Sequence, residues 1–379
     1  MKKIPMLDLA AQYAGLKNEI DDAMAEVLAS GEYIMGQHVE SFENNLAEYL
    51  GVKHAIGVAS GSDALMLALH AAGIRAGDKV IVPAFTFFSA AAAVVRVGAT
   101  PVFCDIDFQT FLLDYDMLAQ LGADEDCKAV IPVHLFGQAC DMAVVMEIAQ
   151  KHNLLVIEDA RHAIDGMAYT ENDEKKSGTI GLAGCYSFSP SKNLGGCGDG
   201  GMIVTDDDAV ADKAHILRMH GARQKHHHEM IGYSSRLDAI QAAILDVKLK
   251  YLPEWTEGRQ RVAMAYDKAF ANEKLEGLMI WPAIEAGHVF HQFVITCPVR
   301  DRLAQWLGEK GISTAIYYPE PLHLQPCFKY LGYPAGSLPV AEMAAKQVLA
   351  LPIDPLLTDE SVTYIAESIK AFYKELGRE

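Results

Sequence analysis

The chain lacks the features of a secreted or membrane-embedded protein. Its seven cysteines include no CxxC pair, and their odd number is typical of reduced thiols in the cytoplasm. No run of 18 apolar residues, the length that a membrane span needs, occurs anywhere. The first residues contain no apolar signal core, because Asp8 interrupts it. We therefore expect a cytoplasmic protein with no membrane partner.

Basic side chains are also scarce. Thirty-two lysines and arginines stand against fifty aspartates and glutamates, which gives a formal net charge of -18. This charge argues against binding to nucleic acids and to acidic membranes, which attract basic surfaces. Anionic ligands would have to be met by local donors such as helix N-termini and a few arginines. The histidine run 226–228 does not predict a metal site, because consecutive side chains point apart.

Apolar residues are abundant, at 51% of a chain of 379 residues, which indicates a globular protein of about two domains. From about residue 50 to 210, apolar runs alternate with helical patterns. This alternation predicts an α/β fold with a mostly parallel central sheet that is covered on both faces. We expect helices at 63–70 and 90–97, and strands at 79–83, 100–104, 129–133, 156–158 and 202–205.

An amphipathic helix over 237–252 is followed by Pro253, which is expected to stop it. We place a domain boundary there, which gives a large domain over 1–250 and a smaller C-terminal α/β domain over 251–379. In the second domain we expect strands at 289–296 and 313–318, and helices at 301–309 and 340–349.

The most informative residue is Lys192, which lies in Cys185-Tyr-Ser-Phe-Ser-Pro-Ser-Lys-Asn-Leu-Gly-Gly-Cys-Gly-Asp-Gly-Gly201. It has no charged neighbour from Ala183 to Cys197, and small residues beside it leave room for a ligand. Such a lysine suits Schiff-base formation with an aldehyde cofactor, because desolvation lowers its pKa and frees the amine. The glycines at 196–201 fit a GxGxxG string, but a strand pattern follows instead of the helix that a dinucleotide site requires.

Asp159 follows the apolar run 154–157, at the end of an expected buried strand. On its own, such an aspartate is commonly a helix cap or a salt-bridge partner. Together with Lys192 it forms the pair that pyridoxal phosphate needs. The acid keeps the pyridine nitrogen protonated, and the protonated ring is the electron sink.

Ser60-Gly-Ser-Asp-Ala-Leu65 opens an expected helix. Capping of that helix is one interpretation. The free amides of the first turn could equally bind the phosphate of a cofactor, with help from the helix dipole.

With these residues in place, the chain resembles the DegT/DnrJ/EryC1/StrS family of sugar aminotransferases, within the fold-type I (aspartate aminotransferase-like) pyridoxal phosphate enzymes. The resemblance runs nearly end to end. Besides the three segments above, it rests on Pro5-Met-Leu-Asp-Leu9, Gly31-Glu-Tyr-Ile-Met-Gly36, Pro83-Ala-Phe-Thr-Phe-Phe-Ser89, Gly98-Ala-Thr-Pro-Val-Phe-Cys-Asp-Ile-Asp107, Gly232-Tyr-Ser-Ser-Arg-Leu-Asp238, Gln241-Ala-Ala243, Tyr318-Pro-Glu-Pro-Leu-His323 and Leu351-Pro-Ile353. The subgroup that aminates 3-keto nucleotide sugars is the most similar, on Ser191-Lys-Asn-Leu194, Gly198-Asp-Gly-Gly201 and Leu322-His-Leu-Gln-Pro326.

The resemblance implies roles for individual residues. Lys192 and Asp159 would be catalytic, and Phe87 would stack on the pyridine, although a phenylalanine in such a run is usually core. His162 would lie near the ring or its phenolic oxygen. The cofactor-binding set is Gly61, Ser62, Asp63, Phe87, Asp159, His162, Ser187, Lys192 and Ser234, and the substrate-binding set is Arg236, Tyr317 and His323. No metal ligand is implied.

Some of these positions depart from the family's pattern. Ser234 stands where relatives have asparagine, and its side chain is shorter and offers only one hydrogen-bond donor. Arg236 matches the family and would bind a carboxylate or diphosphate, or else form an interface salt bridge. Tyr317 replaces a common histidine, which favours a neutral 3-keto-deoxysugar over a 3-keto-uronate.

The implied reaction transfers an amino group from L-glutamate, through pyridoxamine phosphate, to a nucleotide-linked ketosugar. The product would serve cell-surface polysaccharide or glycosylated natural-product synthesis. A homodimer with shared active sites is expected, because the segment 232–238 crosses the interface in relatives. A 4-ketosugar is the alternative acceptor. A related sugar dehydratase or a catalytically silent homologue is disfavoured, because Lys192 and Asp159 are both present.

Overall fold

A computed structural model describes residues 3–171 and 173–377. Its centre is a seven-stranded sheet of order β1-β9-β8-β5-β4-β2-β3. The strands β8, β5, β4, β2 and β3 are parallel, and β9 runs antiparallel to both its neighbours. The expected α/β fold with a mostly parallel sheet is therefore confirmed. The strands are β1 (His54–Val58), β2 (Lys79–Pro83), β3 (Thr100–Cys104), β4 (Cys127–Val130), β5 (Leu155–Asp159), β8 (Ala183–Ser187) and β9 (Gly201–Thr205).

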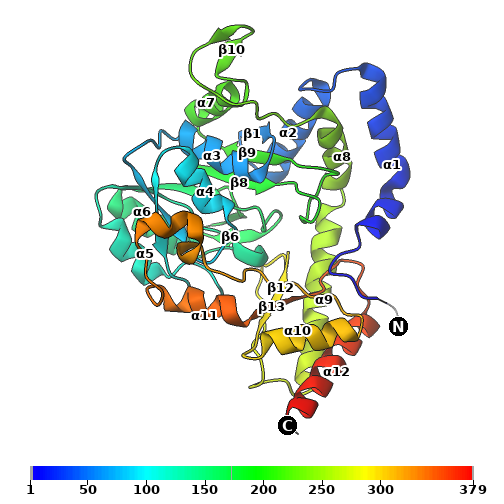
Figure 1. Ribbon diagram of the computed structural model, residues 1–379. Helices are drawn as coiled ribbons and strands as arrows, with labels where there is room; N and C mark the ends of the chain where they lie inside the picture. The colour runs from blue at the N-terminus through cyan, green and yellow to red at the C-terminus, as the bar shows by residue number, and fades with distance from the viewer. Residues whose placement is uncertain (1–2, 172, 378–379) are drawn as a thin grey trace.

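Helices cover both faces of this sheet (Figure 1). In β9, Ile203 joins the apolar cluster that includes α3, whereas Met202 and Val204 join the cluster with α2 and α8 on the opposite face. Burial on both faces explains why these strands read as continuous apolar runs. The helices of this part are α1 (Leu9–Ser30), α2 (Gln37–Leu50), α3 (Gly61–Ala71), α4 (Ser89–Arg96), α5 (Tyr115–Gly122), α6 (Met142–His152), α7 (Asp208–Arg218) and α8 (Ala239–Leu249).

The C-terminal part is built on a second apolar core. Its members come from α9 (Leu252–Asn272), α10 (Arg300–Glu309), α12 (Asp359–Leu376) and the antiparallel pair β12 (Phe293–Thr296) and β13 (Val348–Leu351). Helix α9 runs from one core to the other, because Leu252 packs with α2 and α8 and Val262 packs in the C-terminal cluster. Helix α11 (Pro339–Gln347) packs against the large core instead. The division at residue 250 stays a prediction.

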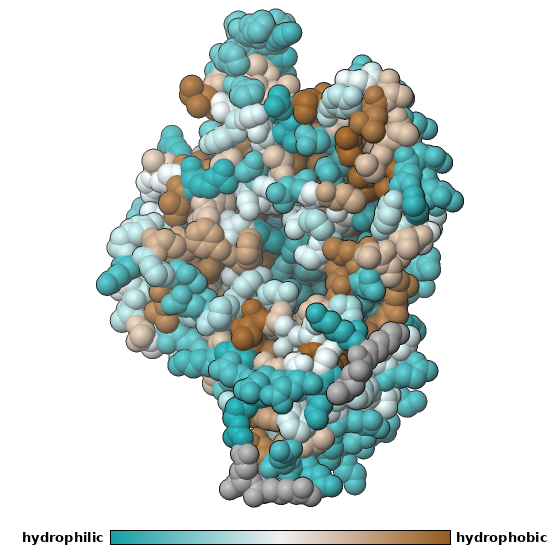
Figure 2. All heavy atoms as spheres, turned by 45° about the vertical axis from the view of Figure 1, so that its right-hand side comes forward, coloured by the Kyte–Doolittle hydropathy of each residue, from teal (hydrophilic) through white to brown (hydrophobic). Residues whose placement is uncertain are grey.

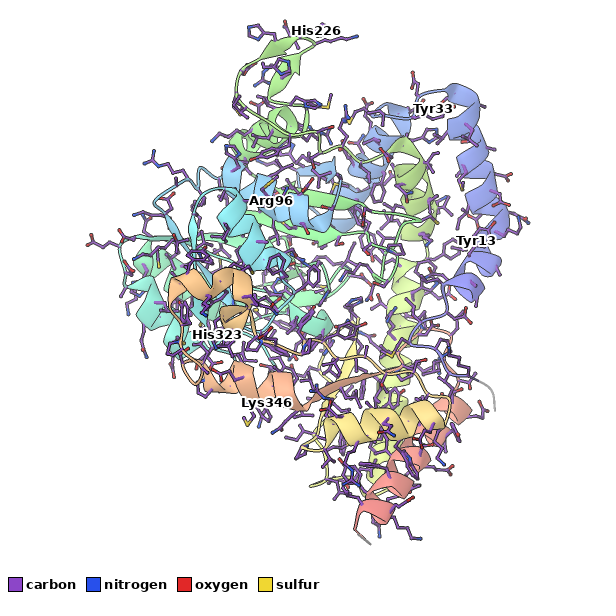
Figure 3. All side chains as sticks on the ribbon, in the orientation of Figure 1. Tyr13, Tyr33, Arg96, His226, His323 and Lys346 are labelled. Atoms are coloured by element: carbon purple, nitrogen blue, oxygen red, sulfur yellow. The ribbon has the colours of Figure 1, made fainter. Side chains whose placement is uncertain are left out.

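Two small hairpins complete the fold, β6 (Met167–Tyr169) with β7 (Glu174–Lys176) and β10 (Ala222–Gln224) with β11 (His227–His228). His226 lies at the tip of the second hairpin, which projects from the top of the molecule in Figures 1 and 3. Among residues 3–171 and 173–377, no helix is long and apolar enough to cross a bilayer. Within the same ranges, no group of three His, Cys, Asp or Glu side chains is arranged to hold a metal ion.

The strand expected over 313–318 is wrong. Only Ala315 makes a bridge, with Ala350, through hydrogen bonds of 3.2 and 2.8 Å. Pro319 and Pro321 follow closely and have no N–H to donate to a ladder. Pro253 was expected to stop a helix, and it also lies in the first turn of the next helix, α9. A missing N–H costs nothing there, because the first amides of a helix have no partner within it.

Candidate active site

Lys192 lies in the turn that joins β8 to β9. The turn closes on itself, because the amides of Phe188 and Gly196 donate to the carbonyls of Gly200 and Phe188, both at 2.8 Å. The strand β9 follows the glycines, as the sequence pattern predicted, instead of the helix that a dinucleotide site requires. Burial, together with the positive charge of Arg161, lowers the pKa of Lys192 to about 7, although the charge of Asp159 opposes both effects. A large share of the amine is therefore unprotonated near neutral pH.

Asp159 ends β5, which lies beside β8 in the sheet, and its residue opposite in the register is Cys185. The carboxylate is 1% exposed. Its Oδ1 accepts a hydrogen bond of 2.6 Å from Nε of Arg161. Its Oδ2 is buried and has no hydrogen-bond partner among the described residues. A buried carboxylate oxygen without a partner is costly, so this atom is a candidate acceptor for a ligand's N–H.

Two buried imidazoles lie next to Lys192. The rings of His162 and His291 have centroids 4.5 Å apart. The amide of Phe136 donates to Nδ1 of His162 at 3.3 Å, and Nδ1 of His291 faces Oδ1 of Asn193 at 3.0 Å. Because an amide oxygen only accepts, the neutral His291 carries its proton on Nδ1 and leaves a lone pair on Nε2, which lies 3.5 Å from Nζ of Lys192.

The pKa values of both histidines are well below the usual value. Burial is the main cause for each, and the positive charge of Lys192 adds to it. Both rings are therefore neutral near pH 7, and they add no positive charge beside the amine of Lys192. His162 was expected at this site from the sequence, whereas His291 was not.

The N-terminus of α3 lies directly against Ser187. A Cβ added to Gly61 would come within 2.5 Å of the Ser187 Cβ, so only glycine fits there. The Ser60 hydroxyl caps the helix by accepting from the amide of Asp63 at 3.1 Å. The carboxylate of Asp63 accepts from Arg96 Nη1 at 3.2 Å and from Ser235 Oγ at 2.8 Å. Asp63 therefore fixes neighbouring elements with its side chain. The groups of this corner that could bind an anion are the first amides of the helix and the serine hydroxyls.

Phe87 is 46% exposed, so it does not belong to the core. Its ring lies 6.1 Å from that of Tyr318, and the guanidinium carbon of Arg161 lies 5.7 Å from its centroid. An exposed aromatic ring beside Arg161, which pairs with Asp159, is suited to stacking on a flat ligand.

The expected substrate-binding residues fall into different places. Arg236 donates to Ser234 Oγ at 2.9 Å, and both line a cavity of about 350 Å³ with Gly198 and Asp199. Tyr317 lies beside Tyr318, with ring centroids 5.9 Å apart.

His323 is 1% exposed and faces Glu342 of α11 at 3.1 Å (residue labelled in Figure 3). These contacts bury the ring between the turn 322–324 and α11, and they do not support the expected contact with a substrate. The substrate-binding role of His323 stays a prediction.

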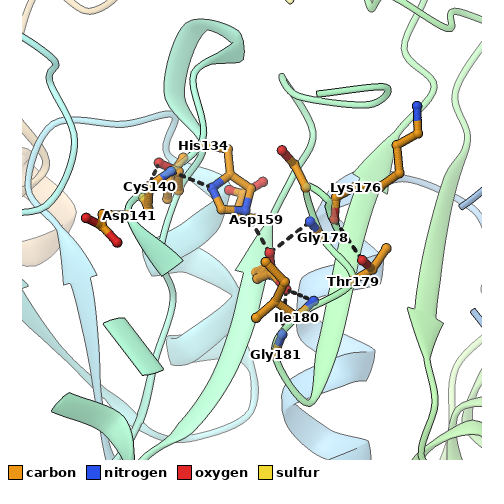
Figure 4. A network of polar contacts seen from close by, with 12 residues as sticks. His134, Cys140, Asp141, Asp159, Lys176, Gly178, Thr179, Ile180 and Gly181 are labelled. Atoms are coloured by element: carbon orange, nitrogen blue, oxygen red, sulfur yellow. Dashed lines mark hydrogen bonds and ion pairs between the residues drawn. The ribbon is translucent and has the colours of Figure 1, made fainter. Parts of the chain in front are cut away.

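Glu158, next to Asp159, is the centre of a polar network whose partners His134, Gly178, Ile180 and Gly181 are labelled in Figure 4. Its carboxylate accepts from the amides of Gly178, Ile180 and Gly181 at 2.8, 2.7 and 2.6 Å, and from Nε2 of His134 at 2.9 Å. The amide of Cys140 donates to the other nitrogen of His134 at 3.1 Å. Burial would raise the pKa of Glu158, but the hydrogen bonds from His134 and from the backbone amides outweigh it and lower the pKa.

A cavity of about 960 Å³ lies elsewhere, and its lining includes none of Lys192, Asp159 and His162. Three of its four aspartates form local hydrogen bonds. Asp114 and Asp141 cap α5 and α6, and Asp107 accepts three hydrogen bonds within its own turn. The cavity therefore does not compete with the Lys192 site as the candidate active site.

Comparison with known proteins agrees with this geometry. The family model of the DegT/DnrJ/EryC1/StrS aminotransferases matches residues 15–370. The chain is 48% identical to the "Pleiotropic regulatory protein" of Geobacillus stearothermophilus, over 99% of this chain and 100% of that one. It is 44% identical, over 97% of each chain, to a UDP-N-acetyl-3-dehydro-alpha-D-glucosamine 3-aminotransferase of Acidithiobacillus ferrooxidans.

Among solved structures, the crystal structure of S. venezuelae DesV in complex with a ketimine intermediate superposes with a TM-score of 0.93 at 38% identity, covering 98% of this chain and 99% of that one. The match of the family model, the fold and the Lys192 site lead to one conclusion: the chain belongs to the DegT/DnrJ/EryC1/StrS aminotransferase family.

Proposed function

We propose that this protein is a pyridoxal phosphate-dependent aminotransferase that moves an amino group from L-glutamate to the 3-keto group of a nucleotide-linked sugar. The observation that carries the proposal is the pairing of a buried, largely unprotonated Lys192 with the unpartnered Oδ2 of Asp159. Support for the acceptor comes from the relatives, since that of A. ferrooxidans is named for a 3-dehydro UDP-sugar.

The residues of the site fit this cofactor. Asp159 Oδ2 would accept the N–H of the pyridine ring, Phe87 would stack on the ring, and Lys192 would bind the aldehyde carbon. The amides at the start of α3, with Ser62 and Ser187, would hold the phosphate. When bound, the cofactor supplies an electron sink for the charge left by a departing α-proton.

Lys192 is also the group that moves the proton. Its amine is tethered at the site and has a pKa of about 7, so it can both accept and return a proton near neutral pH. The lone pair of His291 Nε2 lies 3.5 Å away and can accept one N–H of the amine, which orients the other toward the ligand. His162 and His291 are neutral and exclude water from this side.

For the acceptor we favour a neutral 3-keto-deoxysugar over a 3-keto-uronate. Tyr317 offers a neutral hydroxyl at the position assigned to the substrate, whereas Arg236 could hold a carboxylate. Specificity constants for the two acceptors discriminate between them. A preference for the uronate of more than tenfold, about 1.4 kcal/mol of transition-state binding, would contradict the assignment of Tyr317.

We further propose a homodimer that works in the cytoplasm and shares its active sites. Ser234 is exposed and Arg236 half-buried in this protomer, beside the cavity described above. Figure 2 shows hydrophobic side chains on the face that carries α1, where Leu9, Leu28 and Ile34 are exposed. All seven cysteines are free, as expected in a reducing compartment.

One experiment tests the activity directly. The purified protein is mixed with pyridoxal phosphate, treated with borohydride and digested, and the peptide that carries Lys192 is weighed. We expect a reduced cofactor adduct on Lys192 and amination of 3-keto in preference to 4-keto nucleotide sugars with glutamate. A protein with neither adduct nor amination would be a catalytically silent homologue, and the proposal would be wrong.

A further inference from the structure

Arg161 is a buried cation in the middle of the candidate site, where it pairs with Asp159. Its side chain is 5% exposed. Nε donates to Asp159 Oδ1 at 2.6 Å, Nη1 donates to Ser89 Oγ, and the guanidinium carbon lies 5.7 Å from the centroid of Phe87. Nη2 is buried without a hydrogen-bond partner among the described residues.

These contacts are the ones that the cofactor's ring would need. A protonated pyridine is a flat cation that stacks on an aromatic ring and pairs with a carboxylate, and a guanidinium has the same preferences. Arg161 thus uses Phe87 and Asp159, the two side chains that would hold the ring. The second oxygen of Asp159 is buried as well, so a ring nitrogen reaches it only if a neighbouring side chain moves.

We propose that Arg161 competes with the cofactor for this place: its guanidinium lies against Phe87 and Asp159, and it must turn away before the pyridine ring can bind there. The inference rests on the proposed function, because it concerns the same cofactor. In this role Arg161 limits how readily pyridoxal phosphate binds, which the catalytic residues alone would not do.

Competition has a consequence that can be measured. Removing the guanidinium removes the group that must be displaced, so cofactor should bind more tightly. It also leaves the buried charge of Asp159 without a counter-charge, which destabilises the cofactor-free protein until the ring arrives. Tighter binding and a larger stabilisation by cofactor should therefore appear together.

The test compares Arg161→Met with the wild-type full-length protein after removal of cofactor. Pyridoxal phosphate is titrated into each, with the near-visible absorbance and the melting temperature as readouts. We expect the Kd of Arg161→Met to be at least tenfold lower, its melting temperature without cofactor to be lower, and its rise on adding cofactor to be larger. Arg300→Met is the matched control, because Arg300 is another buried arginine paired with an aspartate and touches no residue of the site.

An unchanged or higher Kd in Arg161→Met would overturn the inference. Ser89→Ala keeps the Arg161–Asp159 pair but removes the partner of Nη1, so it should lower the Kd by a smaller factor even if Arg161→Met folds poorly. An unchanged Kd in Ser89→Ala would also count against competition. If pyridoxal phosphate binds neither the wild type nor Arg161→Met, the proposed function is refuted. If it binds both with the same Kd, only the role of Arg161 is refuted.

Discussion

At the scale of single residues, Lys192 carries the chemistry. Lys192→Ala removes both the covalent anchor and the proton carrier, so we expect transamination to be lost while the fold is retained. Turnover with glutamate and a 3-ketosugar measures the first, and circular dichroism with the melting temperature measures the second. Near wild-type turnover in the variant would show that another group does this work.

The pH dependence of cofactor capture reports the state of the same amine. Only the unprotonated form attacks an aldehyde, and the pKa of Lys192 is lowered to about 7 by burial and by the charge of Arg161. The capture rate of pyridoxal phosphate should therefore be constant well above pH 7 and fall about tenfold per unit below it. Stopped-flow absorbance on cofactor-free protein measures this. A rate that still climbs between pH 8 and 10 would mean an ordinary lysine.

The sequence allowed some of these residues to be predicted and hid others. Lys192 and Asp159 follow the ends of neighbouring strands, so local patterns of apolar, acidic and glycine residues were enough to pair them. His291 reaches Lys192 from 99 positions away, through a segment whose pattern indicated only a strand. Arg161 stands two residues after Asp159 in the sequence. Its role could not be predicted, because that role depends on the direction in which its side chain turns.

At the scale of elements, the N-terminus of α3 is held against β8 by the absence of a side chain at Gly61. In Gly61→Ala the new Cβ would lie 2.5 Å from the Ser187 Cβ, so helix and strand must move apart. We expect the Kd for pyridoxal phosphate to rise at least tenfold, about 1.4 kcal/mol. Gly15→Ala is the control, because nothing lies within 4 Å of its added Cβ and its affinity should be unchanged. Equal affinities of Gly61→Ala and the wild type would show that the phosphate does not bind at the N-terminus of α3.

The carboxylate of Glu158 attaches the turn 178–181 to β5. In Glu158→Gln, one carboxylate oxygen becomes an NH₂ that faces backbone amides, so we expect a loss of about 3 kcal/mol in the free energy of unfolding. Because the folded state lowers the pKa of Glu158, its stabilisation is present above the ordinary glutamate pKa and is lost as the pH falls through the lower folded value. Chemical denaturation from pH 7 down to pH 3 measures this.

The variant provides its own control in that series. Glutamine does not titrate, so the difference in stability between the wild type and Glu158→Gln should shrink as the pH falls. A difference that stays constant down to pH 3 would show that the charge of Glu158 does not matter.

At the scale of the whole molecule, the fold class followed from the alternation of strands and helices, but the packing of distant segments did not. Ile4 joins the C-terminal core, and α11 packs against the large core. Such long-range returns leave no periodic signal, because each segment only shows which of its faces is apolar.

The last prediction concerns the arrangement of two protomers. If Arg236 serves the partner's site, a hybrid of Lys192→Ala and Arg236→Ala protomers has one site with both residues intact, although each parent dimer has none. Mixing the two variants should therefore restore activity, in proportion to the hybrid fraction seen by native mass spectrometry. Each variant mixed with itself is the control. Subunit exchange without any recovery of activity would show that Arg236 serves its own protomer, where its contact with Ser234 is already made.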